Sequence, residues 1–184
     1  QEGLIAHFPL DENAVGTGIA NWNGNTSEVS FIDDQQRSQV AQFSNSHIPI
    51  DEGGPSQFIM PIYEMTISCW VKPEQFVEWG GYVGNIRDTL DNEHGWVLGS
   101  RDNHFSFGLR TDGSSITYLT APESASANQW YHLTGTYNGS NMKLFIDGNM
   151  VSETTAQSGL ITYPDYCWFE IGSYRDDDEL NNFT

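Results

Sequence analysis

The stretch from Trp130 to Gly148 constrains the fold of this chain most strongly, because it has the pattern of two antiparallel strands joined by a tight turn. Trp130–Tyr137 is rich in the aromatic and β-branched residues that favour a pleated strand. Asn138-Gly139 supplies the positive φ angles that a two-residue hairpin turn requires. Met142–Ile146 is the returning strand, and after a second turn Met150–Thr155 can pair back again. The stretch therefore predicts a three-stranded meander.

Alternation of apolar and polar residues predicts strands along the rest of the chain. Met65–Val71 alternates strictly, with Ile67 and Cys69 on one face and Ser68 and Trp70 on the other. The size of Trp70 on the second face indicates that this face is partly covered as well. Turn signals separate about a dozen such segments. The other expected strands are Gly3–Leu10, Val29–Ile32, Gln39–Phe43, Ile48–Ile50, Gly95–Ser100, His104–Arg110, Ser115–Thr120 and Cys167–Ile171.

The pattern contains no helix signal, repeat or linker, so we predict an all-β protein with one domain over residues 1–184. Antiparallel strands that bury one face favour a two-sheet β-sandwich. Phe76–Gly84 is aromatic and rich in glycine, and Asn85–His94 is charged. We expect the region from Trp79 to Trp96 to lie largely outside the core, with Asn85–His94 as a loop.

The charge of the chain excludes some classes of partner. There are 25 acidic and 7 basic residues, which give a formal net charge of −18. A surface this negative repels nucleic acid and anionic membranes. No apolar run approaches the roughly 20 residues of a membrane-spanning helix. Clustered carboxylates suit calcium, but simple solubility accounts for most of the charge.

Cys69 and Cys167 both lie in segments with a strand pattern. A disulfide between them would close a loop of about a hundred residues and stabilise the fold by about 4–5 kcal/mol in the chain-entropy model. Two buried thiols that act as small apolar residues are the alternative. The sequence leaves both open.

Three segments carry a resemblance to a known family. They are Gly3-Leu4-Ile5-Ala6-His7-Phe8-Pro9-Leu10-Asp11-Glu12, Met65-Thr66-Ile67-Ser68-Cys69-Trp70-Val71-Lys72-Pro73, and Trp130 to Gly148, and Ile171-Gly172-Ser173 adds a late strand. The chain resembles the laminin-G-like, concanavalin A-like lectin-glucanase jelly-roll domains of exported bacterial proteins. The resemblance implies a concanavalin A-like jelly roll and an extracellular or periplasmic location.

The domains that this chain resembles usually continue into a final strand of the form Gly-x-Ile-Asp-Glu-Val. Residues up to Thr184 contain no such pattern, so we expect a jelly roll that lacks its last strand. The resemblance favours a non-catalytic, carbohydrate-binding accessory domain of a larger exported protein. Its partners would be a glycan or polysaccharide and neighbouring domains of the same polypeptide. An adhesion or spacer domain with a protein partner is the first alternative.

Two regions, Trp79 to Trp96 and Tyr174 to Asp176, combine aromatic and polar side chains as sugar-binding sites do. The C–H groups of a sugar face stack on aromatic rings, and its hydroxyls bind polar groups. Loops from distant parts of a sandwich can meet at one end, so we expect the two regions to converge. The alternative is that the rings belong to the core and the charges to ordinary loops. The candidate residues are Trp79, Tyr82, Arg87, Asp88, Glu93, Tyr174, Arg175 and Asp176.

Calcium is the cofactor that the sequence suggests, as a structural ion. It takes carboxylate, amide and carbonyl oxygens. No EF-hand pattern is present, and the related jelly rolls often take one ligand from the final strand. The candidate ligands are Asp11, Asn13, Asn21, Asp176, Asp177 and Asp178.

An enzyme of the concanavalin A-like class is the second alternative. Glycoside hydrolysis requires two carboxylates on either side of the bond, and the glucanases of this fold carry them as Glu-x-Asp-x-x-Glu. The sequence contains no such run and no nucleophile motif. We therefore expect a domain that is not an enzyme.

Overall fold

The computed structural model describes residues 3–20, 22–50, 60–87, 93–112, 114–163, 168–176 and 179–182. The strands are β1 (Ser30–Asp34), β2 (Ser38–Gln42), β3 (Ile48–Ile50), β4 (Met65–Val71), β5 (Trp79–Arg87), β6 (His94–Arg101), β7 (His104–Leu109), β8 (Thr117–Thr120), β9 (Tyr131–Tyr137), β10 (Met142–Ile146), β11 (Asn149–Thr154), β12 (Trp168–Ile171), β13 (Ser173–Asp176) and β14 (Glu179–Asn182). None of the described residues forms a helix. The part of the chain that the structure describes contains no helix long and apolar enough to cross a membrane.

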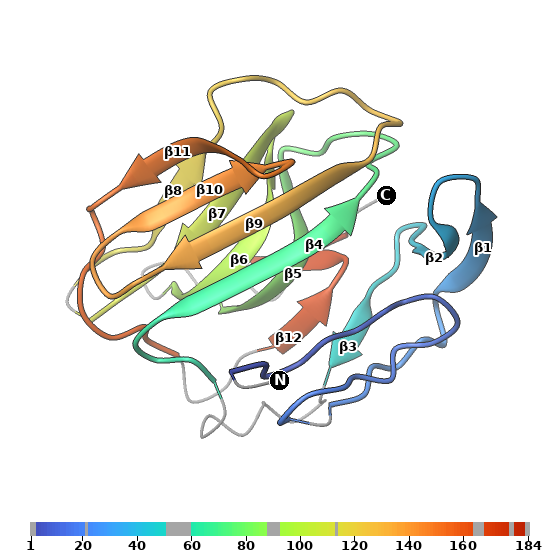
Figure 1. Cartoon of the computed structure of the whole chain (residues 1–184), viewed down its shortest axis with the longest axis horizontal. Helices are drawn as coiled ribbons and strands as arrows, with labels where there is room; N and C mark the ends of the chain where they lie inside the picture. Colours follow the sequence, from blue (N-terminus) through green and yellow to red (C-terminus); the bar gives the residue numbers. More distant parts are fainter. Residues whose placement is uncertain are drawn as a thin grey trace.

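Two antiparallel sheets form the body of the molecule (Figure 1). One has the order β11-β10-β9-β4 and the other β3-β12-β5-β6-β7-β8. Two hairpins, β1-β2 and β13-β14, add to them. The predicted all-β sandwich is confirmed, and so is the meander, because β9, β10 and β11 pair in sequence order.

The core lies between the two sheets because alternate side chains of each strand point inward. Phe107 of β7, Leu133 of β9 and Leu144 of β10 are completely buried. Gly135 of β9 lies against Phe107 across the layer, so close that a Cβ there would be 2.7 Å from the Phe107 ring. The two sheets are therefore in direct contact at this point of the core.

Two predictions about secondary structure were wrong. Residues 3–10 form no strand but a single bridge between His7 and Thr17. Pro9 has no N–H to give to a ladder, and Leu10 takes a positive φ of 56°, so the extended run ends there.

The second error concerns the region after Phe76. Trp79–Arg87 is a nine-residue strand in the six-stranded sheet, and most of its residues are buried. Its glycines have no side chains, so the alternation of apolar and polar residues that indicates a strand is not visible in this part of the sequence. Packing explains why position 81 is a glycine, because a Cβ there would lie 2.0 Å from the backbone oxygen of Ser173. The chain beginning β13 therefore crosses directly over β5.

Candidate functional site

The outer face of the six-stranded sheet has a shallow floor of small residues. Gly81 of β5, Gly99 of β6 and Ser106 of β7 lie opposite one another in register. Gly108 follows on the same face, where a Cβ would lie 2.8 Å from the Tyr118 ring. Inward neighbours such as Phe107 fill the core instead. The floor leaves room for large side chains to lie flat against the sheet.

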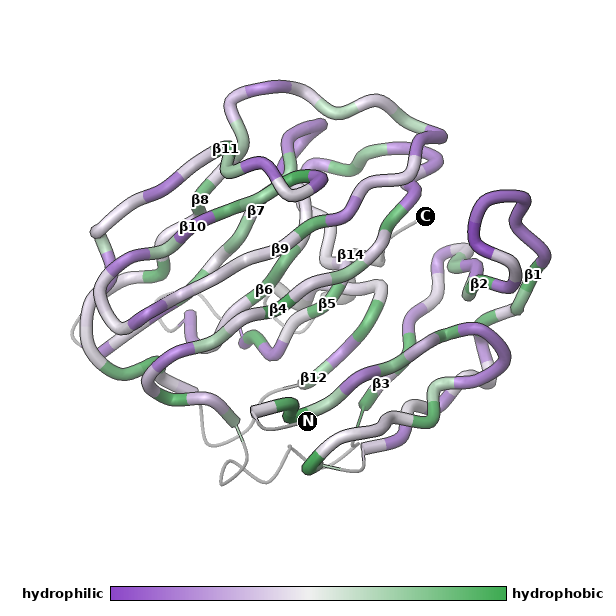
Figure 2. Tube along the Cα trace, in the orientation of Figure 1, coloured by the Kyte–Doolittle hydropathy of each residue, from purple (hydrophilic) through white to green (hydrophobic). Residues whose placement is uncertain are grey.

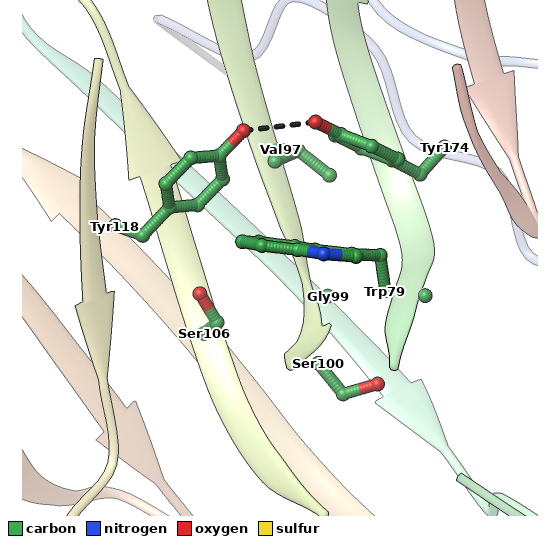
Figure 3. Close-up of a pocket in the computed structure, with 8 residues that line it drawn as sticks. Trp79, Val97, Gly99, Ser100, Ser106, Tyr118 and Tyr174 are labelled. Carbon is green, nitrogen blue, oxygen red and sulfur yellow. Dashed lines mark hydrogen bonds between the residues drawn. The ribbon is translucent and has the colours of Figure 1, made fainter. Parts of the chain in front are cut away.

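Three aromatic side chains, Trp79, Tyr118 and Tyr174, occupy this floor, and we call them the aromatic cluster. Tyr174 stacks on Trp79 with ring centroids 6.1 Å apart and planes 18° apart. Tyr118 lies 5.1 Å from Trp79 at a tilt of 59°. The two tyrosine hydroxyls are 3.0 Å apart and share a hydrogen bond (Figure 3). Strands β5, β8 and β13 thus contribute one ring each.

A cation completes the aromatic cluster. The guanidinium carbon of Arg101 lies 4.5 Å from the Trp79 ring centroid, and Arg101 pairs with Trp79 in the β5–β6 register. Arg101 is exposed and Trp79 is partly exposed, whereas Tyr174 is buried. The cavity between the rings is only about 10 Å³, roughly the space of one water molecule. The cluster is therefore a surface platform and not a deep pocket.

The structure brings together two of the predicted sugar-binding residues, Trp79 and Tyr174. Their neighbours Tyr118 and Arg101 were not among the residues predicted from the sequence. Tyr118 directly precedes Leu119, whose side chain faces the core, so strand alternation could have placed the Tyr118 ring on the outer face. Arg101 is next to Trp79 only through the register of the β5–β6 hairpin, and the sequence did not reveal that register.

Three other predicted residues are not part of this cluster. Tyr82 is buried in the core, where its ring packs at 6.0 Å against Phe105, so its assignment to a surface site was wrong. Arg87 is at the opposite end of β5, about 27 Å from Trp79 along an extended strand. Glu93 lies near it, and its carbonyl oxygen accepts a hydrogen bond from Arg110. Arg87 and Glu93 therefore lie away from the aromatic cluster, although the two predicted regions do meet at Trp79 and Tyr174.

The remaining predictions fall largely outside the described residues. These are Asp88, Asn21, Asp177, Asp178 and Cys167, together with the side chains of Arg175 and Asp176. Asp11 is exposed, and the Asn13 side-chain oxygen accepts a hydrogen bond of 2.8 Å from the Val15 N–H. Within the described ranges, no three His, Cys, Asp or Glu side chains are grouped to hold a metal. Calcium binding stays a prediction.

Cys69 of β4 packs against the core and is not paired with any other described residue. Burial raises its pKa to about 12, so this thiol is a poor nucleophile near neutral pH. Its pairing with Cys167 stays a prediction, because Cys167 is among the residues not described.

A second group of aromatic and charged residues fixes the β1–β2 turn to the other sheet. The turn is among the most hydrophilic stretches of the chain (Figure 2). The guanidinium carbon of Arg37 lies 3.1 Å from the ring centroid of Trp70, which is 49% exposed on the outer face of β4. Asp34 accepts hydrogen bonds of 3.1 Å from both Lys72 Nζ and Trp130 Nε1. These five residues form what we call the hairpin latch.

The hairpin latch is expected to weaken in acid. The backbone N–H of Gln36 donates to the Asp34 carboxylate and lowers its pKa, with further lowering from Lys72 and Trp130 against an opposing effect of burial. A lowered pKa stabilises the fold above the ordinary value of 3.8, and the contribution disappears as the pH falls through the folded-state value. Asp34→Asn is therefore expected to be less stable than the parent at about pH 7 and equally stable at about pH 2. Urea unfolding at both pH values measures the difference, and Asp33→Asn, a neighbouring exposed carboxylate, is the control. A difference that persists unchanged in acid would contradict this assignment.

Comparison with known proteins identifies the family to which this fold belongs. The fold defines an antiparallel jelly roll of the lectin type, and the Laminin_G_3 family model, described as the concanavalin A-like lectin/glucanases superfamily, matches residues 44–183. The chain belongs to this family. Pappalysin-1 of Mus musculus is 29% identical over 117 residues, which are 57% of this chain and 7% of that protein. The chain thus matches only a small part of the length of this relative.

Two solved structures share the fold at low identity. Domain 4 of a GH43 extracellular arabinanase from Geobacillus stearothermophilus, in complex with arabinotriose, has a TM-score of 0.63 and 16% identity, covering 98% of this chain and 88% of that one. The CBM40 of the Ruminococcus gnavus IT-sialidase, bound to α2,3-sialyllactose, has a TM-score of 0.61 and 14% identity, covering 85% and 84%. At these identities the similarity establishes the fold.

Proposed function

We propose that this chain is a carbohydrate-binding accessory domain and that its aromatic cluster is the sugar platform. The observation that carries the proposal is Trp79, held flat by Tyr174 and flanked by the guanidinium of Arg101. A rigid ring offers a surface for sugar C–H groups. The exposed Arg101 can swing from the ring and donate to sugar hydroxyls or a carboxylate.

The comparisons support this proposal in outline. Domain 4 of the arabinanase was solved with arabinotriose and the CBM40 with sialyllactose, so related folds carry glycans. The arabinanase is an extracellular enzyme with further domains, which supports our proposal of an exported, accessory role beside neighbouring domains. We also propose that the domain binds without turnover and that any calcium is structural. Product chromatography after prolonged incubation with a bound glycan tests the first of these.

The binding test uses a glycan array, with and without calcium, followed by titration calorimetry with the best ligand. Arabinotriose and sialyllactose are the first probes. Trp79→Ala is expected to weaken binding about 5- to 15-fold, because loss of one aromatic contact is worth about 1–1.5 kcal/mol. Arg101→Ala is expected to weaken it less.

Two matched variants control for this result. Trp70→Ala removes an exposed tryptophan from the other sheet, and Arg87→Ala removes an arginine from the far end of β5. Both are expected to leave the affinity unchanged. Unaltered binding by Trp79→Ala would assign the glycan to another surface, and an array with no bound glycan would overturn the proposal and favour a protein partner.

A further inference from the structure

A group of basic side chains lies at one end of the six-stranded sheet, away from the aromatic cluster. Arg87 is the last residue of β5 and pairs in register with His94, the first residue of β6. Arg110 directly follows β7, and its N–H donates to the Gly95 carbonyl at 3.0 Å. Three neighbouring strands therefore bring one basic side chain each to the same end of the sheet. We call Arg87, His94 and Arg110 the basic corner.

Polar atoms at the basic corner are buried without a partner. Nε of Arg87 and Nε of Arg110 have no hydrogen-bond partner among the described residues, and the same is true of the Thr162 hydroxyl. Thr162 is next to Arg110, because its N–H donates to the Arg110 carbonyl at 3.1 Å. A buried donor is normally satisfied, and an unsatisfied one is costly, above all when the group is charged. Three of them at one corner indicate an acceptor that the described residues do not supply.

The positive charge of the basic corner is not neutralised by a described carboxylate. Among the described residues, no salt bridge joins Arg87 or Arg110 to an acidic side chain. Arg110 donates through Nη1 to the backbone carbonyl of Glu93 instead. The pKa of His94 is lowered, first by burial and then by the positive charges of Arg110 and Arg87. The corner therefore holds two positive charges beside an imidazole that is neutral near pH 7.

This arrangement needs an explanation in a chain that is so acidic. The chain has 25 acidic and 7 basic residues, so carboxylates that could oppose two arginines are abundant. Like charges held together repel each other and destabilise the folded state. Both arginines are only partly buried, so a molecule from the solvent can reach their guanidiniums. An anionic ligand would remove the repulsion and supply the missing acceptors.

The charge of the basic corner favours a phosphomonoester over other anions. A phosphomonoester carries about −1.5 to −2 near pH 7 and offers three acceptor oxygens, whereas a carboxylate or a sulfate ester carries a single negative charge. Two guanidiniums match this charge, and the planar fork of each can bind two of the oxygens. A phosphodiester has a single charge as well, and the net charge of −18 repels nucleic acid.

We propose that the basic corner binds the doubly charged phosphate group of a phosphomonoester. Arg87 and Arg110 hold the phosphate from two strands, and the Thr162 hydroxyl donates a further hydrogen bond. A sugar phosphate and free inorganic phosphate share this chemistry, and the test below separates them. The assignment does not depend on glycan binding at the aromatic cluster, which lies toward the other end of β5.

Titration calorimetry on the 184-residue chain tests the class of ligand. The probes are glucose 6-phosphate, glucose 6-sulfate and glucose, at about pH 7.5 and about 150 mM salt, where repulsion from distant carboxylates is screened. Glucose 6-phosphate is expected to bind at least about tenfold more tightly than glucose 6-sulfate, because it brings about twice the charge to the two guanidiniums. Glucose is expected not to bind.

Inorganic phosphate, as a fourth probe, distinguishes the two sources. Binding as tight as that of glucose 6-phosphate would support a site that recognises the phosphate group alone. Weaker binding would support a site in which the sugar makes contacts as well. These measurements use the unaltered protein, so they test the proposal even if a variant fails to fold.

Variants of the basic corner test the location. Arg87→Gln and Arg110→Gln each remove one guanidinium and are expected to weaken glucose 6-phosphate binding about tenfold. Arg87→Lys keeps the charge without the planar fork and is expected to retain only part of the affinity. Thr162→Val removes the hydroxyl and is expected to have a smaller effect. Lys143→Gln removes a base from β10 of the other sheet and is expected to leave the binding unchanged.

Three results would overturn the proposal. The first is no binding of either phosphate probe, and the second is equal binding of glucose 6-phosphate and glucose 6-sulfate. The third concerns Asp88 and Asp91, which stand between Arg87 and His94 in the sequence and lie outside the described residues. If glucose 6-phosphate binds only after Asp88→Asn and Asp91→Asn, the two guanidiniums serve carboxylates of the chain itself.

Discussion

Phe107→Ala is expected to lower the free energy of unfolding by about 3–5 kcal/mol, the range for a fully buried phenylalanine. The Phe107 ring is completely buried and lies against Gly135 of the opposite sheet. Its loss leaves a cavity between two layers whose backbones are each held by strand pairing, so the site cannot collapse fully. Urea unfolding followed by circular dichroism measures the change.

The matched control is Phe145→Ala in β10, which removes a ring that is only partly buried. It is expected to cost clearly less than Phe107→Ala. The complementary variant Gly135→Ala puts a methyl group against the same ring, and overpacking of this kind costs about 1–3 kcal/mol. Phe107→Leu in that background is expected to recover part of the loss. A Phe107→Ala variant no less stable than Phe145→Ala would contradict the packing of the two sheets at this point.

The strands that were predicted correctly are those whose alternating side chains and turn residues are adjacent in the sequence. Met65–Val71 alternates without a gap, and the structure forms β4 over the same residues. Trp130–Tyr137 and Met142–Ile146 are joined by a turn whose Gly139 has a φ of 88°. Period and turn chemistry are local properties, so a single sequence reveals them.

Prediction of β5 and of the aromatic cluster would have required contacts between residues that are far apart in the sequence. Three glycines interrupt the alternation of Trp79–Arg87, so the segment resembled a loop. Once it is known to be a strand, the spacing of three between Trp79 and Tyr82 places their rings on opposite faces. The contact between Trp79 and Tyr174 further requires β13 to cross β5, and only tertiary packing determines that crossing. Sequence chemistry could therefore suggest the ring types, but not which of them meet.

The loop that leads into β8 is held by a buried polar side chain, Gln157, which no sequence motif indicates. Gln157 is 1% exposed. Its side-chain oxygen accepts hydrogen bonds from the Thr111 N–H at 2.8 Å and from the hydroxyls of Thr111 and Ser114 at 2.6 Å each. Its amide nitrogen donates to the Ser115 carbonyl at 2.7 Å and to the Thr117 hydroxyl at 2.8 Å. One side chain thus binds four described residues between the end of β7 and the start of β8, Thr111, Ser114, Ser115 and Thr117.

Gln157→Leu is expected to lower the free energy of unfolding by about 3–5 kcal/mol, because each buried polar group left without a partner costs about 1–3 kcal/mol. The Thr111 N–H and the Ser115 carbonyl are the two backbone groups that lose their bonds to Gln157. Gln36→Leu, at an exposed turn position, is expected to change stability by no more than about 0.5 kcal/mol. Because Thr117 directly precedes Tyr118, the variant is also expected to weaken glycan binding at the aromatic cluster. Chemical unfolding and calorimetry measure the two effects on one preparation. A Gln157→Leu protein as stable as the parent would show that other groups hold this loop, and one that is unstable but binds glycan normally would separate the loop from the site.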